Sequence, residues 1–323
     1  MHITSETIAA IDLGSNSFRL VIAELNKTDG FSLSNILVDE LRVVRLSENL
    51  QQSGQLSAEA ISRGLAVCRS FAERLQQFAP MSLRICGTAA LRTAANRYEF
   101  ISAAQELLPV KIEVLTAPEE AELALRGCTA GLTTRDSGPT ILIDAVGGST
   151  ELIFFQPGEE PEVCSLPFGA VNLTEFFLPS RPESGVDITR LEEHLQDIIT
   201  PALSGLVPGR CSSSKDLKLW AAGGTATALA TLDLGLSEYR ASLIQGHEIT
   251  AKSIEQIVSL LSGLSTSKRN NLAGLGHRGE IIMAGIKIYQ TILKIAKVDH
   301  LTICASGLLE GILLSVKAAR ANI

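Results

Sequence analysis

The chain has 323 residues, of which 46% are hydrophobic, and its formal net charge is −7 at pH 7. This length exceeds one ordinary hydrophobic core and predicts two domains. The acidic balance and the lack of a basic block argue against general nucleic-acid binding, which depends on lysine and arginine. The longest apolar run, residues 281–298, is interrupted by lysines and is not typical of a membrane helix.

The N-terminal stretch MHITSETIAAIDLG has no basic segment and no signal-peptide core, so we expect the protein to act in the cytoplasm without contact with a membrane. The six cysteines are scattered, with no CxxC pair and no histidine at ligand spacing. We therefore expect reduced thiols rather than disulfides or a zinc site.

One pattern occurs twice. Residues 8–25 read IAAIDLGSNSFRLVIAEL and residues 140–155 read TILIDAVGGSTELIFF. Each is an apolar run, an aspartate, a turn of small polar residues and a second apolar run, which predicts a β-hairpin. The offset is too long for a solenoid repeat and indicates a duplicated domain. Three positions correspond in this register: Asp12 with Asp144, Ser17 with Ser149, and Arg19 with Glu151.

Between and after the hairpins, strands and helices alternate. A helix is predicted over Ser57–Phe78, with Ser57 as N-cap, Glu59 in the first turn and Pro80 just beyond its end. Residues 82–108, 112–132, 217–236 and 298–320 each read as a short strand, a turn and a helix. This alternation favours an α/β fold with mainly parallel central strands.

Four apolar strands end in turns of small residues: DLGSNS, CGTAALR, DAVGGST and AAGGTAT. Such turns expose several backbone N–H groups that suit phosphate oxygens, although one turn alone often only connects two elements. Asp12 and Asp144 stand at two of these strand ends, where carboxylates commonly hold Mg²⁺ or another divalent cation. The agreement among the turns indicates phosphate binding.

The hairpins and the later GGT turn look like the actin, sugar-kinase and heat-shock ATPase superfamily. Within it, the sequence closely resembles the exopolyphosphatase/guanosine pentaphosphate phosphohydrolase (Ppx/GppA) family, in a short two-domain form. The stretches AAIDLGSNSFRLVIAEL, GTAALRTAANRYEFI, IEVLTAPEEAELALRG, ILIDAVGGSTELI, SLPFGAVNLTEFF and AAGGTATALATLDLGL carry the resemblance. It implies two actin-like (ribonuclease H-like) α/β domains with a cleft between them. These would be residues 1–126, with the C-terminal helix 306–323 packed on them, and residues 127–305.

The resemblance also implies roles for individual residues. Glu120, the second glutamate of PEEA, would activate the attacking water; Asp144 and Glu151 would coordinate magnesium, with Asp12 joining through water. The residues that match substrate-binding positions are Gly14, Ser15, Asn16, Ser17, Arg19, Arg45, Arg92, Gly147, Gly148, Ser149, Gly223, Gly224 and Thr225.

Simpler interpretations remain open for several of these positions. Glu119 and Glu120 also read as first-turn acids that favour the helix dipole. Arg92 could also lie on the surface of a helix, and Glu151 at an exposed strand position. The GGT turn could serve only to pack a helix on a strand.

Some residues depart from the family pattern. Val146 replaces the first glycine of the second turn, and a β-branched residue tolerates positive φ poorly. Leu309 replaces an arginine, and Ser47 and Asn49 replace glycines of an R-L-G-x-G-L segment. These changes favour a weaker activity than that of the family.

The predicted function is hydrolysis of the terminal phosphoanhydride of inorganic polyphosphate, by metal-assisted in-line attack of water that releases orthophosphate. Hydrolysis of guanosine pentaphosphate by the same residues is the closer alternative. A non-catalytic phosphate or alarmone sensor is the more distant one, although a sensor does not need Glu120. A sugar kinase is least favoured, and the apolar composition allows a homodimer.

Overall fold

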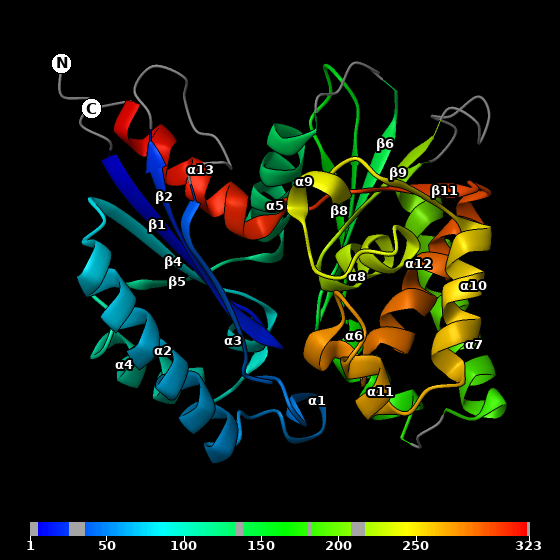
Figure 1. Cartoon of the computed structure of the whole chain (residues 1–323), viewed down its shortest axis with the longest axis horizontal. Helices are drawn as coiled ribbons and strands as arrows, with labels where there is room; N and C mark the ends of the chain where they lie inside the picture. The colour runs from blue at the N-terminus through cyan, green and yellow to red at the C-terminus, as the bar shows by residue number, and fades with distance from the viewer. Residues whose placement is uncertain (1–5, 26–35, 133–137, 180–182, 208–216, 322–323) are drawn as a thin grey trace. The chain divides into compact units, whose positions relative to one another are not determined.

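The computed structural model describes residues 6–25, 36–132, 138–179, 183–207 and 217–321. The chain divides into two compact units (Figure 1). Unit 1 comprises Met1–Gly127 and Leu308–Ile323, and unit 2 comprises Cys128–Gly307. Each unit has its own sheet and is described by itself. None of the helices in the described ranges is long and apolar enough to cross a membrane.

Unit 1 contains a five-stranded sheet of order β3-β2-β1-β4-β5. Its strands are β1 (Glu6–Leu13), β2 (Ser17–Leu25), β3 (Ile36–Val43), β4 (Ser82–Gly87) and β5 (Ile112–Val114). β2 pairs antiparallel with β1 and β3, whereas β1, β4 and β5 run parallel. The helices are α1 (Leu50–Ser53), α2 (Ala58–Phe78), α3 (Ala89–Thr93), α4 (Arg97–Gln105), α5 (Ala117–Gly131) and α13 (Leu308–Ala321).

Alternation along β1 places apolar side chains on both faces of this sheet. Ala9 and Ile11 join the core under α2 and α4, whereas Ile8 and Ala10 join the one under α5 and α13. Figure 1 shows α2 and α13 on opposite sides of the strands. The sheet is therefore buried on both faces, as expected for an α/β layer.

Helix α2 forms for the predicted reasons. The Ser57 hydroxyl accepts a hydrogen bond from the Ala60 amide at 3.1 Å, which caps the N-terminus. Its buried residues recur every three or four positions and give one apolar face: Ala60, Gly64, Cys68, Phe71 and Leu75.

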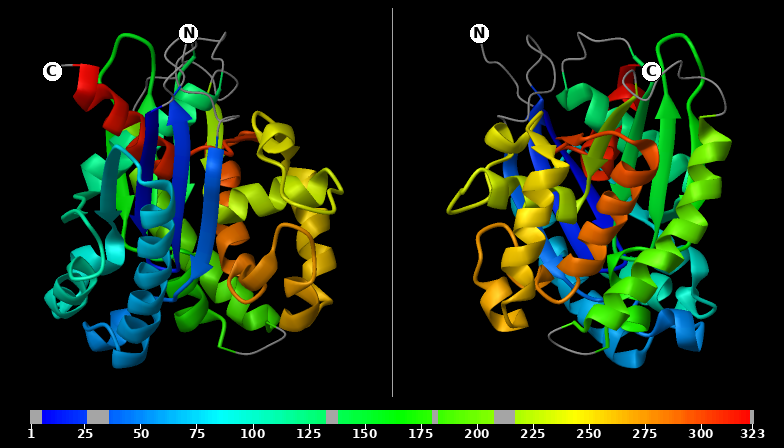
Figure 2. Two further views of the ribbon diagram at one scale, coloured as in Figure 1. Left: turned by 60° about the vertical axis from the view of Figure 1, so that its left-hand side comes forward. Right: turned by 90° about the vertical axis from the view of Figure 1, so that its right-hand side faces the viewer.

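Unit 2 contains a six-stranded sheet of order β10-β11-β9-β6-β7-β8. Its strands are β6 (Thr140–Ala145), β7 (Thr150–Phe155), β8 (Glu162–Leu166), β9 (Lys218–Ala222), β10 (Glu248–Thr250) and β11 (His300–Ile303). The helices are α6 (Ala170–Phe177), α7 (Gly185–Leu206), α8 (Gly224–Asp233), α9 (Ala241–Ile244), α10 (Ala251–Ser262), α11 (Thr266–Asn270), α12 (Ile282–Ala296) and the 3₁₀ turn η2 (Gly276–Arg278). Helices α7, α10 and α12 lie together on one side of this sheet (Figure 2, right).

The two sheets repeat one topology. In both, a central strand pairs antiparallel with its hairpin partner and parallel with a later strand, so β3-β2-β1-β4-β5 corresponds to β8-β7-β6-β9-β11. Asp12 lies opposite Arg19 in the first hairpin, and Asp144 lies opposite Glu151 in the second. The prediction of an α/β fold with a duplicated unit is confirmed.

The described cysteines carry free thiols: Cys68, Cys86, Cys128, Cys164 and Cys304. Cys211 lies outside the described residues. Burial raises the pKa of Cys68 and of Cys86 to about 12, so both thiols stay protonated and unreactive at neutral pH.

Candidate active site

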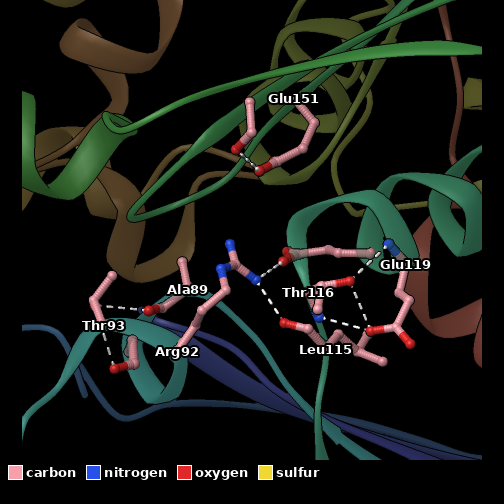
Figure 3. Close-up of polar contacts among 10 residues, drawn as sticks. Ala89, Arg92, Thr93, Leu115, Thr116, Glu119 and Glu151 are labelled. Atoms are coloured by element: carbon pink, nitrogen blue, oxygen red, sulfur yellow. Dashed lines mark hydrogen bonds and ion pairs between the residues drawn. The ribbon is translucent and has the colours of Figure 1, made fainter.

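The two glutamates at the start of α5 have different surroundings (Figure 3). Glu119 is exposed and caps the helix, because its carboxylate accepts hydrogen bonds from the Thr116 amide and hydroxyl, both at 2.8 Å. These bonds lower the pKa of Glu119. Glu120 is only 2% exposed. The simpler interpretation as a first-turn acid therefore describes Glu119, whereas Glu120 has another environment.

Arg92 holds the buried Glu120 carboxylate. Its Nη1 donates to Glu120 Oε2 at 2.8 Å and to the Leu115 carbonyl at 2.9 Å. Burial raises the pKa of Glu120, and the Arg92 hydrogen bond and charge oppose that rise. Arg92, predicted as a phosphate ligand, thus also orients the predicted base and favours its ionised form.

The first turn, Gly14–Asn16, joins β1 to β2. A Cβ added to Gly14 would lie 2.8 Å from the Ser17 carbonyl oxygen, so this position requires glycine. The Asn16 carbonyl accepts hydrogen bonds from the amides of residues 44 and 45, and the Ser15 carbonyl accepts one from the amide of residue 47. The Ser15 hydroxyl is buried and has no hydrogen-bond partner among the described residues. A bound anion would satisfy such a donor.

The segment after β3 lies against this first turn. Arg45 has a φ of 53°, in the left-handed region, and its amide donates to the Asn16 carbonyl at 2.8 Å. The Ser47 amide donates to the Ser15 carbonyl at 3.0 Å, and its buried hydroxyl has no partner within the described ranges. Asn49 has a φ of 57°, so it adopts the backbone that the family glycine would.

Arg19, predicted as a phosphate contact, is bound to carboxylates of its own unit. Nε and Nη2 donate to Asp39 at 2.9 and 2.8 Å, and Nη1 lies 3.2 Å from Glu310 Oε1. Leu309, where the family has an arginine, is buried in the apolar core under α13. The guanidinium of Arg19 thus has a structural role in unit 1.

In unit 2, β6 and β7 place two buried carboxylates side by side. Asp144 and Glu151 are direct cross-strand partners and are 5% and 1% exposed, so Glu151 is not an exposed strand residue. The Ser165 hydroxyl donates to Glu151 Oε1 at 3.0 Å (Figure 3). Burial and the Asp144 charge raise the pKa of Tyr289, whose hydroxyl donates to the Ala222 carbonyl at 2.6 Å. Like charges at opposed strand positions are destabilising unless a cation joins them.

The second turn, residues 146–149, packs against the start of α6. The amides of Ala170 and Val171 donate to the first two carbonyls of the turn, and the Asn172 side chain donates to the third. The Ser149 hydroxyl is buried and has no partner among the described residues. Val146 is not among the residues with positive φ, so its side chain is compatible with the turn. Its amide bonds to the Ser149 carbonyl at 3.1 Å and is therefore not available to phosphate.

The third turn joins β9 to α8. Gly223 has a φ of 92°, and an added Cβ would lie 2.9 Å from the Ala145 carbonyl oxygen and 3.3 Å from Asp144 Oδ1. A Cβ on Gly224 would lie 2.5 Å from Nε of Arg278. The side chain of Thr225 instead packs against Gly285 of α12. Gly223 and Gly224 therefore allow the Ala145 carbonyl and the Arg278 guanidinium to approach the backbone of the turn closely. The side chain of Thr225 contributes to the packing of α8 against α12.

Sequence reasoning missed several residues at these positions. Arg278 brings a guanidinium to the third turn, Asp39 binds Arg19, and Asn172 supports the second turn. For Asn172, the sequence signal was the SLPFGAVNLTEFF stretch, which resembled the family without indicating a role for its asparagine.

Unit 2 offers two carboxylates to a metal. Within the described ranges, no group of three or more histidine, cysteine, aspartate or glutamate side chains is placed to hold an ion. A cation at Asp144 and Glu151 would therefore complete its shell with water and ligand oxygens, which is the usual manner of Mg²⁺.

Comparison with known proteins assigns the family. Residues 21–319 match the Ppx/GppA phosphatase family. The chain belongs to this family. It is 29% identical to exopolyphosphatase 2 of Mycobacterium tuberculosis over 322 residues, which cover 96% of this chain and 98% of that protein.

Solved structures agree with this assignment. The Ppx/GppA family member of Aquifex aeolicus is 26% identical, with a TM-score of 0.78 and 99% of both chains covered. An exopolyphosphatase from Cytophaga hutchinsonii has a TM-score of 0.86 at 21% identity, covering 97% of this chain and 98% of its own, and shares the fold. The resemblance inferred from the sequence is confirmed.

Proposed function

We propose that this protein hydrolyses the terminal phosphoanhydride of inorganic polyphosphate and releases orthophosphate. The family is one of phosphatases, and the Mycobacterium tuberculosis relative is named an exopolyphosphatase. The observation that carries the proposal is the environment of Glu120. A buried carboxylate with a raised pKa, held by one arginine and separate from the capping glutamate, suits a general base near neutral pH.

The residues of unit 2 would bind the phosphate and its cation. Two opposed buried carboxylates and a buried serine hydroxyl fit a divalent cation that carries phosphate oxygens. Asp144 and Glu151 would hold Mg²⁺, and the Gly147–Ser149 turn would donate amides to the phosphate. When bound, the ion neutralises charge on the phosphate oxygens. Glu120 would orient a water molecule and accept its proton.

The functional test is orthophosphate release by the purified protein with Mg²⁺. Short-chain polyphosphate, long-chain polyphosphate and guanosine pentaphosphate are offered in parallel, because the family includes enzymes for both substrate classes. We expect release from short polyphosphate by the wild type and by Glu119→Ala. For Glu120→Ala we expect a loss of about 100-fold or more, since a general base contributes about that much.

Two results would contradict the proposal. Wild-type activity in Glu120→Ala would remove the assigned base. No release from any substrate, with tight phosphate binding retained in the wild type and the variant, would favour the sensor. The mass of the same preparations in solution tests whether the protein forms the homodimer that its apolar composition allows.

A further inference from the structure

The second turn owes its shape to the beginning of α6. The amides of Ala170 and Val171 donate to the carbonyls of Val146 and Gly147, both at 2.9 Å. Any residue except proline supplies such a backbone donor. These two bonds therefore place little restriction on the residue types at positions 170 and 171. Position 169 is restricted to glycine, because an added Cβ would collide with the Val146 carbonyl.

The third carbonyl of the turn depends on a side chain. Asn172 Nδ2 donates to the Gly148 carbonyl at 3.1 Å, and Asn172 Oδ1 accepts from the Gly169 amide at 2.6 Å. Both halves of the amide are used, so the side chain is held in one orientation. Among the standard side chains of this length, only asparagine carries both a donor and an acceptor of this kind.

These bonds determine where the amides of the turn point. In a planar trans peptide, the carbonyl and the following N–H lie on opposite sides. Because the carbonyls of residues 146–148 point to α6, the N–H groups of residues 147–149 point away from it. No acceptor for these three N–H groups is found in the described part of the chain. Successive N–H groups on one side form an anion-binding concavity.

We propose that Asn172 is a positioning residue for phosphate binding. It fixes the Gly148–Ser149 peptide so that the Ser149 amide completes the row of donors, and it does not touch the phosphate itself. This inference rests on the proposed function of the turn, and it adds a residue that sets the affinity of unit 2 for a phosphate group.

The test compares two variants of this residue with one control. Asn172→Leu is uncharged and close in shape and removes both bonds, whereas Asn172→Asp keeps only the acceptor for Gly169. The matched control is Asn96→Leu. The Asn96 side chain also forms two hydrogen bonds to backbone, since Nδ2 donates to the Leu56 carbonyl and Oδ1 accepts from the Leu56 amide. Asn96 has no assigned part in phosphate binding.

The measurements are the Kd for inorganic phosphate by calorimetry, kcat/KM with tripolyphosphate, and the melting temperature without ligand. We expect both Asn172 variants to bind phosphate about tenfold more weakly, the scale of one lost hydrogen bond. The kcat/KM should fall by a similar factor. Asn96→Leu should lower the melting temperature without changing the Kd.

Three outcomes would overturn the proposal. Wild-type phosphate affinity in Asn172→Leu would show that the bond is structural only. Weaker binding in Asn172→Asp alone would assign the effect to the added charge, and equal loss in Asn96→Leu would assign it to general destabilisation. Phosphate binding is measured apart from catalysis, so a wild type that binds phosphate without hydrolysis would contradict the proposed function and leave this inference standing.

Discussion

The hairpins β1–β2 and β6–β7 have the same register and differ in the residue that faces their aspartate. Asp12 lies opposite Arg19, whereas Asp144 lies opposite Glu151. Opposite charges at such positions are stabilising and like charges are destabilising. In the first hairpin, the Arg19 guanidinium binds Asp39 and lies 3.2 Å from Glu310 Oε1. The second places two buried carboxylates on opposed strands, and we propose that a cation lies between them, so that two copies of one topology would have different roles.

Among changes to the hairpins, neutralising Glu151 should have the largest effect, because it removes one of the two opposed carboxylates of the second hairpin. Glu151→Gln keeps the acceptor for the Ser165 hydroxyl but loses one carboxylate of the pair. We expect Mg²⁺-dependent orthophosphate release to fall by about 100-fold, since changes around metal ligands cost up to that much. Without Mg²⁺, the free energy of unfolding should rise by a few tenths to about 1 kcal/mol. A variant that loses activity and also loses stability would point to a packing defect instead.

The reciprocal change is in the first hairpin. Arg19→Met removes the cation that binds Asp39 and lies 3.2 Å from the buried Glu310 carboxylate. The free energy of unfolding should fall by about 2 kcal/mol, less than for a fully buried pair because the arginine is partly exposed. Urea unfolding measures this loss, and the Mg²⁺ concentration for half-maximal activity should not change. A large shift in that concentration would give the first hairpin a role in cation binding.

A pH profile of the activity tests the role of Glu120, which lies in α5 and not in either hairpin. Burial raises the pKa of Glu120 above its usual 4.5. A base must be ionised, so activity should fall as the pH drops through this raised pKa. Arg92→Met removes the interaction that lowers the pKa, so the acidic limb should move to higher pH. Glu119→Gln should leave the limb in place while weakening the cap of α5 by about 1 kcal/mol.

The smallest effect is expected from substitutions at Val146 and Gly14, the first residues of the second and first turns. Val146→Gly gains no backbone freedom that the turn needs, because this position does not have positive φ. Stability should fall by about 0.5–1 kcal/mol through the entropy of the unfolded chain, with kinetic constants unchanged. Gly14→Ala should cost more, since its Cβ would lie 2.8 Å from the Ser17 carbonyl oxygen. Equal effects would show that the two turns are interchangeable.

Much of the fold was predictable because it depends on local patterns. The apolar runs, the aspartates and the small turn residues specified both hairpins, and Ser57 marked the start of α2. Glu119 and Glu120 could not be separated by local pattern, since both are acids in one helical turn. The contacts with Thr116 and Arg92 separate them, and Arg92 is 28 residues from Glu120.

Residues that act through distant backbone were not predictable. Asn172 reaches a carbonyl 24 residues away, and Arg19 is bound by a carboxylate 20 residues away. From the sequence alone, an arginine just after a turn of small polar residues suggests a phosphate ligand, because the acidic residues that it contacts lie elsewhere in the chain. The expected cleft between the two domains stays a prediction, as do the roles carried over from the family.

Calorimetric titration with Mg²⁺ most directly tests whether the second hairpin holds the cation. The variants are Asp144→Asn and Asp12→Asn, which make the same change at equivalent positions of the two hairpins. We predict that Asp144→Asn abolishes the binding heat and that Asp12→Asn keeps most of it. Retained binding in Asp144→Asn, or its loss in Asp12→Asn, would contradict the account.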